Sequence, residues 1–119
     1  RLPRIAKPER AATAWWVERD GAVLLVRRPQ KGLLGGMLAL PSNLPAPSEG
    51  WAPACTGATL GVVTHVFTHF RLTLEVVRAT LAPGCVLPPG AQWWPVAALD
   101  SAGLPTLFVK AARLVLRGE

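Results

Sequence analysis

The sequence is poor in the residues that build metal sites and active sites. It has two cysteines, Cys55 and Cys85, which form no C-x-x-C pair, and its seven acidic residues lie singly along the chain. Metal-dependent hydrolysis of phosphate esters needs several carboxylates around the ion. We therefore expect no metal site, no catalytic residue and no cofactor in this chain, and we interpret the cysteines as free thiols rather than a disulfide.

Long hydrophobic runs and an export leader are also missing. No stretch approaches the roughly 20 apolar residues that span a bilayer, and the charged, proline-containing start "RLPRIAKPER" is unlike a signal peptide. We expect a soluble, cytoplasmic protein with no membrane partner. The 119 residues, half of them hydrophobic, suffice for one core. The sequence predicts a linker remnant over 1–7 and one domain over 8–119.

Positive charge is what the chain has in excess. Thirteen Lys and Arg against seven Asp and Glu give a formal charge of +6. Such a surface suits nucleic acid or an acidic protein face, although a soluble basic surface explains it equally well. The candidate phosphate contacts are Arg27, Arg28 and Lys31, with Arg1, Arg4, Lys7 and Arg10 near the start.

The order of the expected elements predicts an α+β fold. Segments 12–19 and 22–27 resemble strands, and Asp20-Gly21 between them suits a tight turn, so we expect an antiparallel hairpin. The remaining expected strands are 37–41, 59–66, 70–79 and 91–99.

Two further segments are distinctive. Residues 42–53 hold three prolines and are expected to be a loop. At the end of the chain, apolar and basic residues recur at spacings of three and four, which predicts an amphipathic helix. Its buried face would comprise Leu107, Phe108, Ala111, Leu114 and Val115, and its charged stripe Lys110, Arg113 and Arg117.

The segment "HVFTHF", residues 65–70, contains both histidines and lies between two expected strands. A zinc pair at His65 and His69 would need a helix and a third ligand, and neither is indicated. From the residues alone, Phe67 and Phe70 are better explained as core packing. The chain has two pairs of adjacent tryptophans, Trp15-Trp16 and Trp93-Trp94, whose members would point to opposite faces of their strands. One tryptophan of each pair would then lie in the core. The other would be covered by a helix, by another domain or by a stacked base.

Four segments in this order, "RRPQKGLLGGMLALP", "THVFTHFRLTLEV", "WWPVAALDSAGLP" and the closing helix, resemble the C-terminal domain of MutY-type adenine DNA glycosylases. The most specific pair is "GLLGGMLALP" with "HVFTHF". The resemblance implies a Nudix-like fold: a mixed, mostly antiparallel sheet with flanking helices, including one C-terminal amphipathic helix. Leu34 stands where the family often has Trp, which we expect to alter packing only.

Nudix hydrolases bind their metal through the glutamates of one conserved box. Anchored at Gly36, that box would need acids at Ser42, Trp51, Ala54 and Cys55, and arginine at Gly50. Every charged position is lost, so the resemblance implies a scaffold that binds without hydrolysing.

In the resembling family this domain recognises 8-oxoguanine opposite adenine. The family loop matches Phe67, Thr68 and His69, which are therefore implied to contact 8-oxoguanine and DNA. The implied partners are duplex DNA containing A:8-oxoguanine and an N-terminal helical catalytic domain that carries a 4Fe-4S cluster. The alternatives are a degenerate Nudix hydrolase and a protein-docking module.

Overall fold

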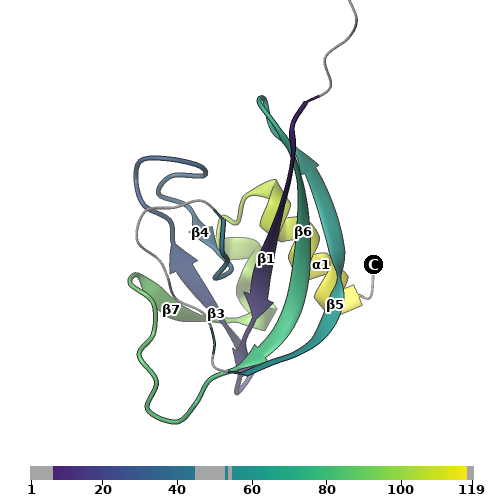
Figure 1. Ribbon diagram of the computed structural model, residues 1–119. Coiled ribbons are helices and arrows are strands. Elements are labelled where there is room, and N and C mark those ends of the chain that lie inside the picture. The colour runs from purple at the N-terminus through teal and green to yellow at the C-terminus, as the bar shows by residue number, and fades with distance from the viewer. Residues whose placement is uncertain (1–6, 45–52, 54, 118–119) are drawn as a thin grey trace, which may run out of the picture.

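The computed structural model describes residues 7–44, 53 and 55–117, which form two β-sheets and a C-terminal helix (Figure 1). The first sheet has the order β1 (Glu9–Trp16), β6 (Arg71–Thr80), β5 (Cys55–Val66). Strand β6 is parallel to β1 and antiparallel to β5. In the second sheet β3 (Ala22–Arg27) pairs along its length with β7 (Ala91–Pro95) and, at its two ends, with β2 (Glu18–Arg19) and β4 (Leu38–Ala39).

The predicted hairpin over 12–27 is wrong for most of its first strand. Only Glu18 and Arg19 pair antiparallel with β3, through a turn in which Asp20 and Gly21 have φ of 52° and 78°. Strand β1 instead pairs in parallel with β6, and the paired residues Glu9 and Arg71 are 62 positions apart in the sequence. A local turn signal cannot indicate such a distant pairing, whereas burial on both faces of β1 demands it.

Two other boundaries differ from the predictions. The strand expected over 91–99 ends at Pro95, and a 3₁₀ helix, η1 (Val96–Ser101), follows because proline removes a backbone donor from the ladder. In the expected loop 42–53, Ser42 bridges Ala14 of β1 and Asn43 accepts a bond from the Thr13 N–H at 2.7 Å. Residues 45–52 and 54 of that segment lie outside the described residues.

The helix α1 (Thr106–Arg117) confirms the predicted amphipathic pattern. Leu107, Phe108 and Ala111 are buried, and Arg113 and Arg117 are exposed. The helix packs against β5, where a Cβ on Gly61 would come within 2.6 Å of Leu114. The glycine at this position therefore lets α1 pack closely on the middle of β5. No helix among the described residues is long and apolar enough to cross a membrane.

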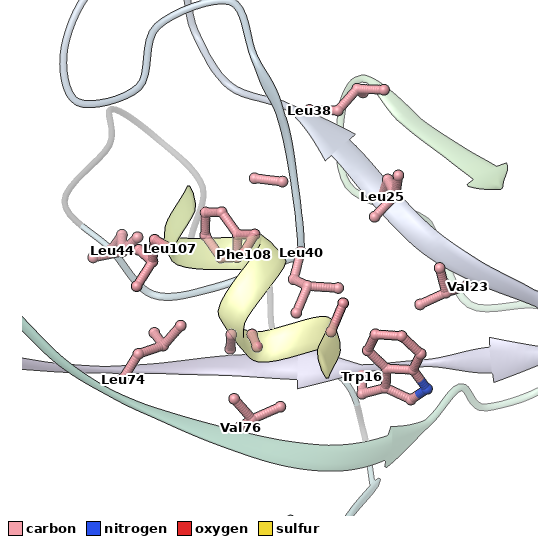
Figure 2. Packing of buried hydrophobic residues seen from close by; sticks show 14 of the residues in the cluster. Trp16, Val23, Leu25, Leu38, Leu40, Leu44, Leu74, Val76, Leu107 and Phe108 are labelled. Atoms are coloured by element: carbon pink, nitrogen blue, oxygen red, sulfur yellow. The ribbon is translucent and has the colours of Figure 1, made fainter. Parts of the chain in front are cut away.

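Two hydrophobic clusters fill the interior. Figure 2 shows the larger one, where Phe108 of α1, Trp16 of β1, Leu40 after β4 and Val76 of β6 converge. Each such side chain contributes about 1.5–3 kcal/mol by its burial. The adjacent tryptophans divide between the clusters, since Trp16 lies in the first and Trp15, 8% exposed, in the second.

The second tryptophan pair divides in the same way. Trp94 packs against the larger cluster and Trp93 against the smaller one, where the guanidinium of Arg19 lies 5.2 Å from its ring. The predicted opposite faces are confirmed, but the expected cover of the second face is wrong: Leu81 and Leu87, from the segment before β7, cover it in place of a helix, another domain or a base. Cys85 in that segment is a free, half-buried thiol, whereas the side chain of Cys55 lies outside the described part of the structure.

Candidate nucleic-acid interface

Residues 67–70, hereafter the hairpin tip, join β5 to β6. The two strands pair up to Val66 and Arg71, and the Phe67 N–H then donates to the Phe70 carbonyl at 2.8 Å. Thr68 and His69 occupy the end of the turn with exposed side chains. The structure therefore places two of the three predicted lesion contacts where a ligand can reach them, at one end of the first sheet (Figure 1).

A row of stacked groups supports the hairpin tip from the face that α1 covers. The Phe67 and Phe70 rings stack at 4.8 Å and 27°, and His65 meets Phe67 edge-on at 4.8 Å. At the other end, the Arg10 guanidinium lies 5.2 Å from the Phe70 ring. Aromatic pairs and cation–π contacts of this kind each contribute about 0.5–1.5 kcal/mol. Phe67 is thus a packing residue in this structure, which holds the turn from below.

The parallel pairing of β1 brings the start of the described chain to the hairpin tip. Lys7, two residues before β1, donates its ammonium to the Phe67 carbonyl at 2.9 Å. Both Lys7 and Arg10 were expected to be phosphate contacts or a solvated tail, and nothing local in the sequence indicates that they meet "HVFTHF". The parallel register of Glu9 with Arg71 brings them there.

The hairpin tip presents hydrogen-bonding groups that the fold does not use. Within residues 7–44, 53 and 55–117, no group bonds to the Thr68 hydroxyl, the His69 ring or the backbone N–H groups of 68–70. The Phe67 carbonyl accepts from the Lys7 ammonium, and the Phe70 N–H makes no bond within the described residues. The tip can therefore donate several bonds and, through the hydroxyl, also accept one.

His65 is fixed at the base of the tip by α1, a contact that the sequence did not predict. The Lys110 ammonium donates to the Thr64 carbonyl at 2.9 Å and lies 3.2 Å from His65 Nδ1. Burial, and secondarily the Lys110 charge, lower the pKa of His65 below 6.5. The imidazole is therefore neutral at neutral pH. Lys110, which was predicted to belong to a charged stripe on α1, thus also bonds to the end of β5.

The other predicted phosphate contacts lie at the end of β3, where Arg27 is the last residue, and in the loop between β3 and β4. Arg28 is buried at 6% exposure, and its Nε donates to the Leu33 carbonyl at 3.1 Å. Arg27 is exposed and donates to the Gly36 carbonyl at 2.7 Å, while Lys31 is exposed. Arg28 is thus a structural residue of the loop, and only Arg27 and Lys31 remain accessible to phosphate. Figure 1 shows this loop at the same end of the molecule as the hairpin tip.

The part of the chain that the structure describes holds no group of three His, Cys, Asp or Glu residues that could bind a metal ion. Of the hydrolase box positions, Ser42 lies in the extended segment beside β1. Gly50, Trp51 and Ala54 fall outside the described residues, as does the Cys55 side chain. None of these positions has an acidic side chain in the sequence.

These features define a domain of the Nudix type. Residues 12–114 match the family described as NUDIX domain, so the chain belongs to that family. The MutT protein from Methanosarcina mazei Go1 shares the fold, with a TM-score of 0.76 over 97% of this chain and 98% of that chain, at 18% identity.

Within the family, the chain is similar to adenine DNA glycosylases. It is 36% identical to that of Mus musculus over 120 residues and 33% identical to that of Homo sapiens over 128 residues, which covers 82% and 89% of this chain. It spans 23% of the length of each relative. The C-terminal domain of mouse MUTYH, solved in complex with human PCNA, matches with a TM-score of 0.66 and 29% identity over 87% of this chain and 85% of that chain. The predicted resemblance is confirmed.

Proposed function

We propose that this chain is the 8-oxoguanine-recognising, DNA-binding C-terminal domain of an A/G-specific adenine DNA glycosylase, and that it is not catalytic by itself. The observation that supports this most directly is the hairpin tip, where Thr68 and His69 are exposed and where the Thr68 hydroxyl and the backbone N–H groups of 68–70 form no bond within the described chain. An N-terminal helical domain with a 4Fe-4S cluster would supply base excision in the cytoplasm.

The chemistry of the lesion matches these groups. 8-Oxoguanine has an N7–H donor and an O8 acceptor, whereas guanine has only the N7 acceptor at that edge. The Thr68 hydroxyl can accept from N7–H while a backbone N–H at the tip donates to O8. The stacked support beneath the tip fixes these groups before binding, which reduces the entropy lost on recognition.

The charges around the tip suit the DNA backbone. Lys7 and Arg10 lie on the β1 side of the tip, and His69 is at its end. The Lys7 and Arg10 cations would meet phosphates next to the lesion, and the exposed His69 ring would add a hydrogen bond; together they would fix the register of the domain on the duplex. Arg27 and Lys31 of the β3–β4 loop are the second candidate contact.

Two other functions compete with this one. A degenerate Nudix hydrolase would need acids at the box positions, which the sequence lacks. A protein-docking module is favoured by the mouse domain, which was solved with human PCNA. Such a module would use the tryptophans as its contact surface, but they make contacts within this chain. Trp15 and Trp16 are buried, and Trp94 Nε1 donates to the Ala98 carbonyl at 2.8 Å.

The test is an NMR titration of ¹⁵N-labelled chain with two duplexes that differ only in A:8-oxoguanine or A:G. We expect tighter binding to the lesion duplex, with the largest amide shifts at Thr68 and His69. Equal affinities, or shifts confined to other surfaces, would contradict the proposal. Incubation with nucleoside triphosphates and Mg²⁺ tests the hydrolase, because turnover that survives repurification and disappears on mutation of one carboxylate would favour it.

A further inference from the structure

A lysine of the C-terminal helix contacts the strand end from which the hairpin tip projects. Lys110 lies on α1 between buried residues of its inner face, and its ammonium donates to the Thr64 carbonyl at 2.9 Å and lies 3.2 Å from His65 Nδ1. An ammonium group has three donors and no acceptor. His65 Nδ1 must therefore accept, which leaves the ring proton on Nε2.

The local charges keep His65 in that neutral form. Its pKa is lowered by burial first and by Lys110 second. The sheet register sets Arg10 of β1 and His65 of β5 on either side of Leu72 in one row. Helix α1 contributes Lys110 and contains no acidic residue. The Lys110 charge thus opposes protonation of the ring, in the same direction as burial.

The orientation of His65 is passed on to the tip by ring contacts. The imidazole meets Phe67 edge-on at 4.8 Å and an interplanar angle of 69°, and Phe67 stacks on Phe70 at 4.8 Å. Phe67 directly precedes Thr68, and Phe70 follows His69. If the imidazole rotates or leaves, Phe67 loses one of its two ring contacts, and the turn that carries the Thr68 hydroxyl is held less firmly.

We propose that Lys110 is a positioning residue for the hairpin tip: by bonding to the Thr64 carbonyl and to His65 Nδ1, it fixes the His65–Phe67–Phe70 stack and thereby orients Thr68. The effect on DNA rests on the proposed function, whereas the effect on the tip does not. Lys110 is half-buried and both of its contacts are internal, so it does not act as a phosphate contact.

The inference is first tested on the unaltered chain. Long-range ¹H–¹⁵N NMR spectra give the tautomer of His65, and we expect a protonated Nε2 and a bare Nδ1. A protonated Nδ1 would overturn the proposal, and this measurement does not depend on any variant folding.

Variants of α1 then test the mechanical link. Lys110→Met keeps the aliphatic stem and removes the donor, Lys110→Arg restores a donor, and Arg113→Met is the control because Arg113 is exposed one turn later. We expect ¹⁵N relaxation to show faster motion of residues 67–70 in Lys110→Met only. Unchanged relaxation in folded Lys110→Met would overturn the proposal.

Binding measurements with DNA test this inference separately from the proposed function. In Lys110→Met the affinity ratio between A:8-oxoguanine and A:G duplexes should fall by about threefold to tenfold, with rescue by Lys110→Arg and no change of the ratio in Arg113→Met. If the unaltered chain has no preference, the proposed function fails, and relaxation and tautomer alone decide the role of Lys110. If the unaltered chain prefers the lesion and Lys110→Met keeps the full preference, Lys110 does not position Thr68.

Discussion

The hairpin tip and the loop between β3 and β4 use their polar groups in opposite ways. In the β3–β4 loop, Arg28 and Arg27 donate to the Leu33 and Gly36 carbonyls of the same loop. The hairpin tip is held from outside itself, by Lys7, by Arg10 and by the His65 contact with α1, while Thr68 at its end has no partner in the described chain.

The difference separates a loop whose polar groups bond to one another from a turn whose polar groups are exposed. Groups that bond within their own loop stabilise it and must be displaced before they can bind a ligand. Groups that are exposed on a rigidly supported turn can bind a ligand without that cost. Both segments contain basic or polar residues in "RRPQK" and "HVFTHF", so composition alone did not distinguish them.

The largest expected effect is on stability, in the β3–β4 loop. Arg28→Met removes a buried, charge-assisted hydrogen bond and leaves the Leu33 carbonyl without its donor. We expect the free energy of unfolding to fall by about 2–3 kcal/mol, measured by urea denaturation. The control Arg27→Met changes an exposed side chain and should cost less than about 1 kcal/mol. If the two variants lowered the free energy of unfolding equally, Arg28 would not be a structural residue of the loop in contrast to Arg27.

The next effect is on recognition, at the hairpin tip. Thr68→Val keeps the shape of the side chain but removes the hydroxyl, so the preference for A:8-oxoguanine over A:G should fall by about 1–3 kcal/mol. The lower end is expected because the backbone N–H groups remain. Thr68→Ser should keep the preference. Adding Phe67→Ala and His69→Ala should enlarge the loss by loosening the turn.

The measurement for Thr68 is the ratio of dissociation constants for the two duplexes, with circular dichroism to confirm folding. A parent glycosylase that contains the same substitutions would report the same ratio in single-turnover rates. If the folded triple variant keeps the ratio, "HVFTHF" is a packed turn and no more.

A smaller effect is expected at the phosphate contacts. Lys7→Gln should weaken binding to both duplexes by the same factor and lower the slope of log affinity against log salt by about 1. Fluorescence anisotropy at several salt concentrations measures this slope. The matched variant Lys31→Gln reports whether the β3–β4 loop also meets DNA. A Lys7→Gln effect on one duplex only would mean that Lys7 acts on recognition, through its bond to the Phe67 carbonyl or at the base pair, and not as a phosphate contact.

The smallest effect is the pH dependence of stability at His65. Its pKa is lowered in the folded state, mainly by burial, so the unfolded chain binds the proton more readily. The stabilisation is complete above the unfolded pKa of about 6.5 and decreases as the pH falls below it towards the folded pKa. Urea denaturation across this range should show a flatter profile in His65→Gln. A steeper profile in that variant would reverse the assigned sign.

Much of the fold could be predicted from the sequence, because the signals that specify it are local. The alternation over 70–79 predicted β6, where Leu72, Leu74 and Val76 are buried, and the helical spacing of Leu107, Phe108 and Ala111 predicted α1. Asp20-Gly21 correctly predicted a tight turn. The motif "HVFTHF" was correctly placed at a turn between two strands, although its first two residues, His65 and Val66, belong to β5.

Only the tertiary structure decided which residues serve that segment. The parallel pairing of β1 with β6 places Lys7 and Arg10 beside the hairpin tip, and the packing of α1 on β5 places Lys110 against His65. The same packing buries Arg28 and withdraws it from the phosphate contacts that charge had suggested. Such contacts join residues about 45–60 positions apart, and their formation depends on the order of the strands, which no local pattern of residues contains.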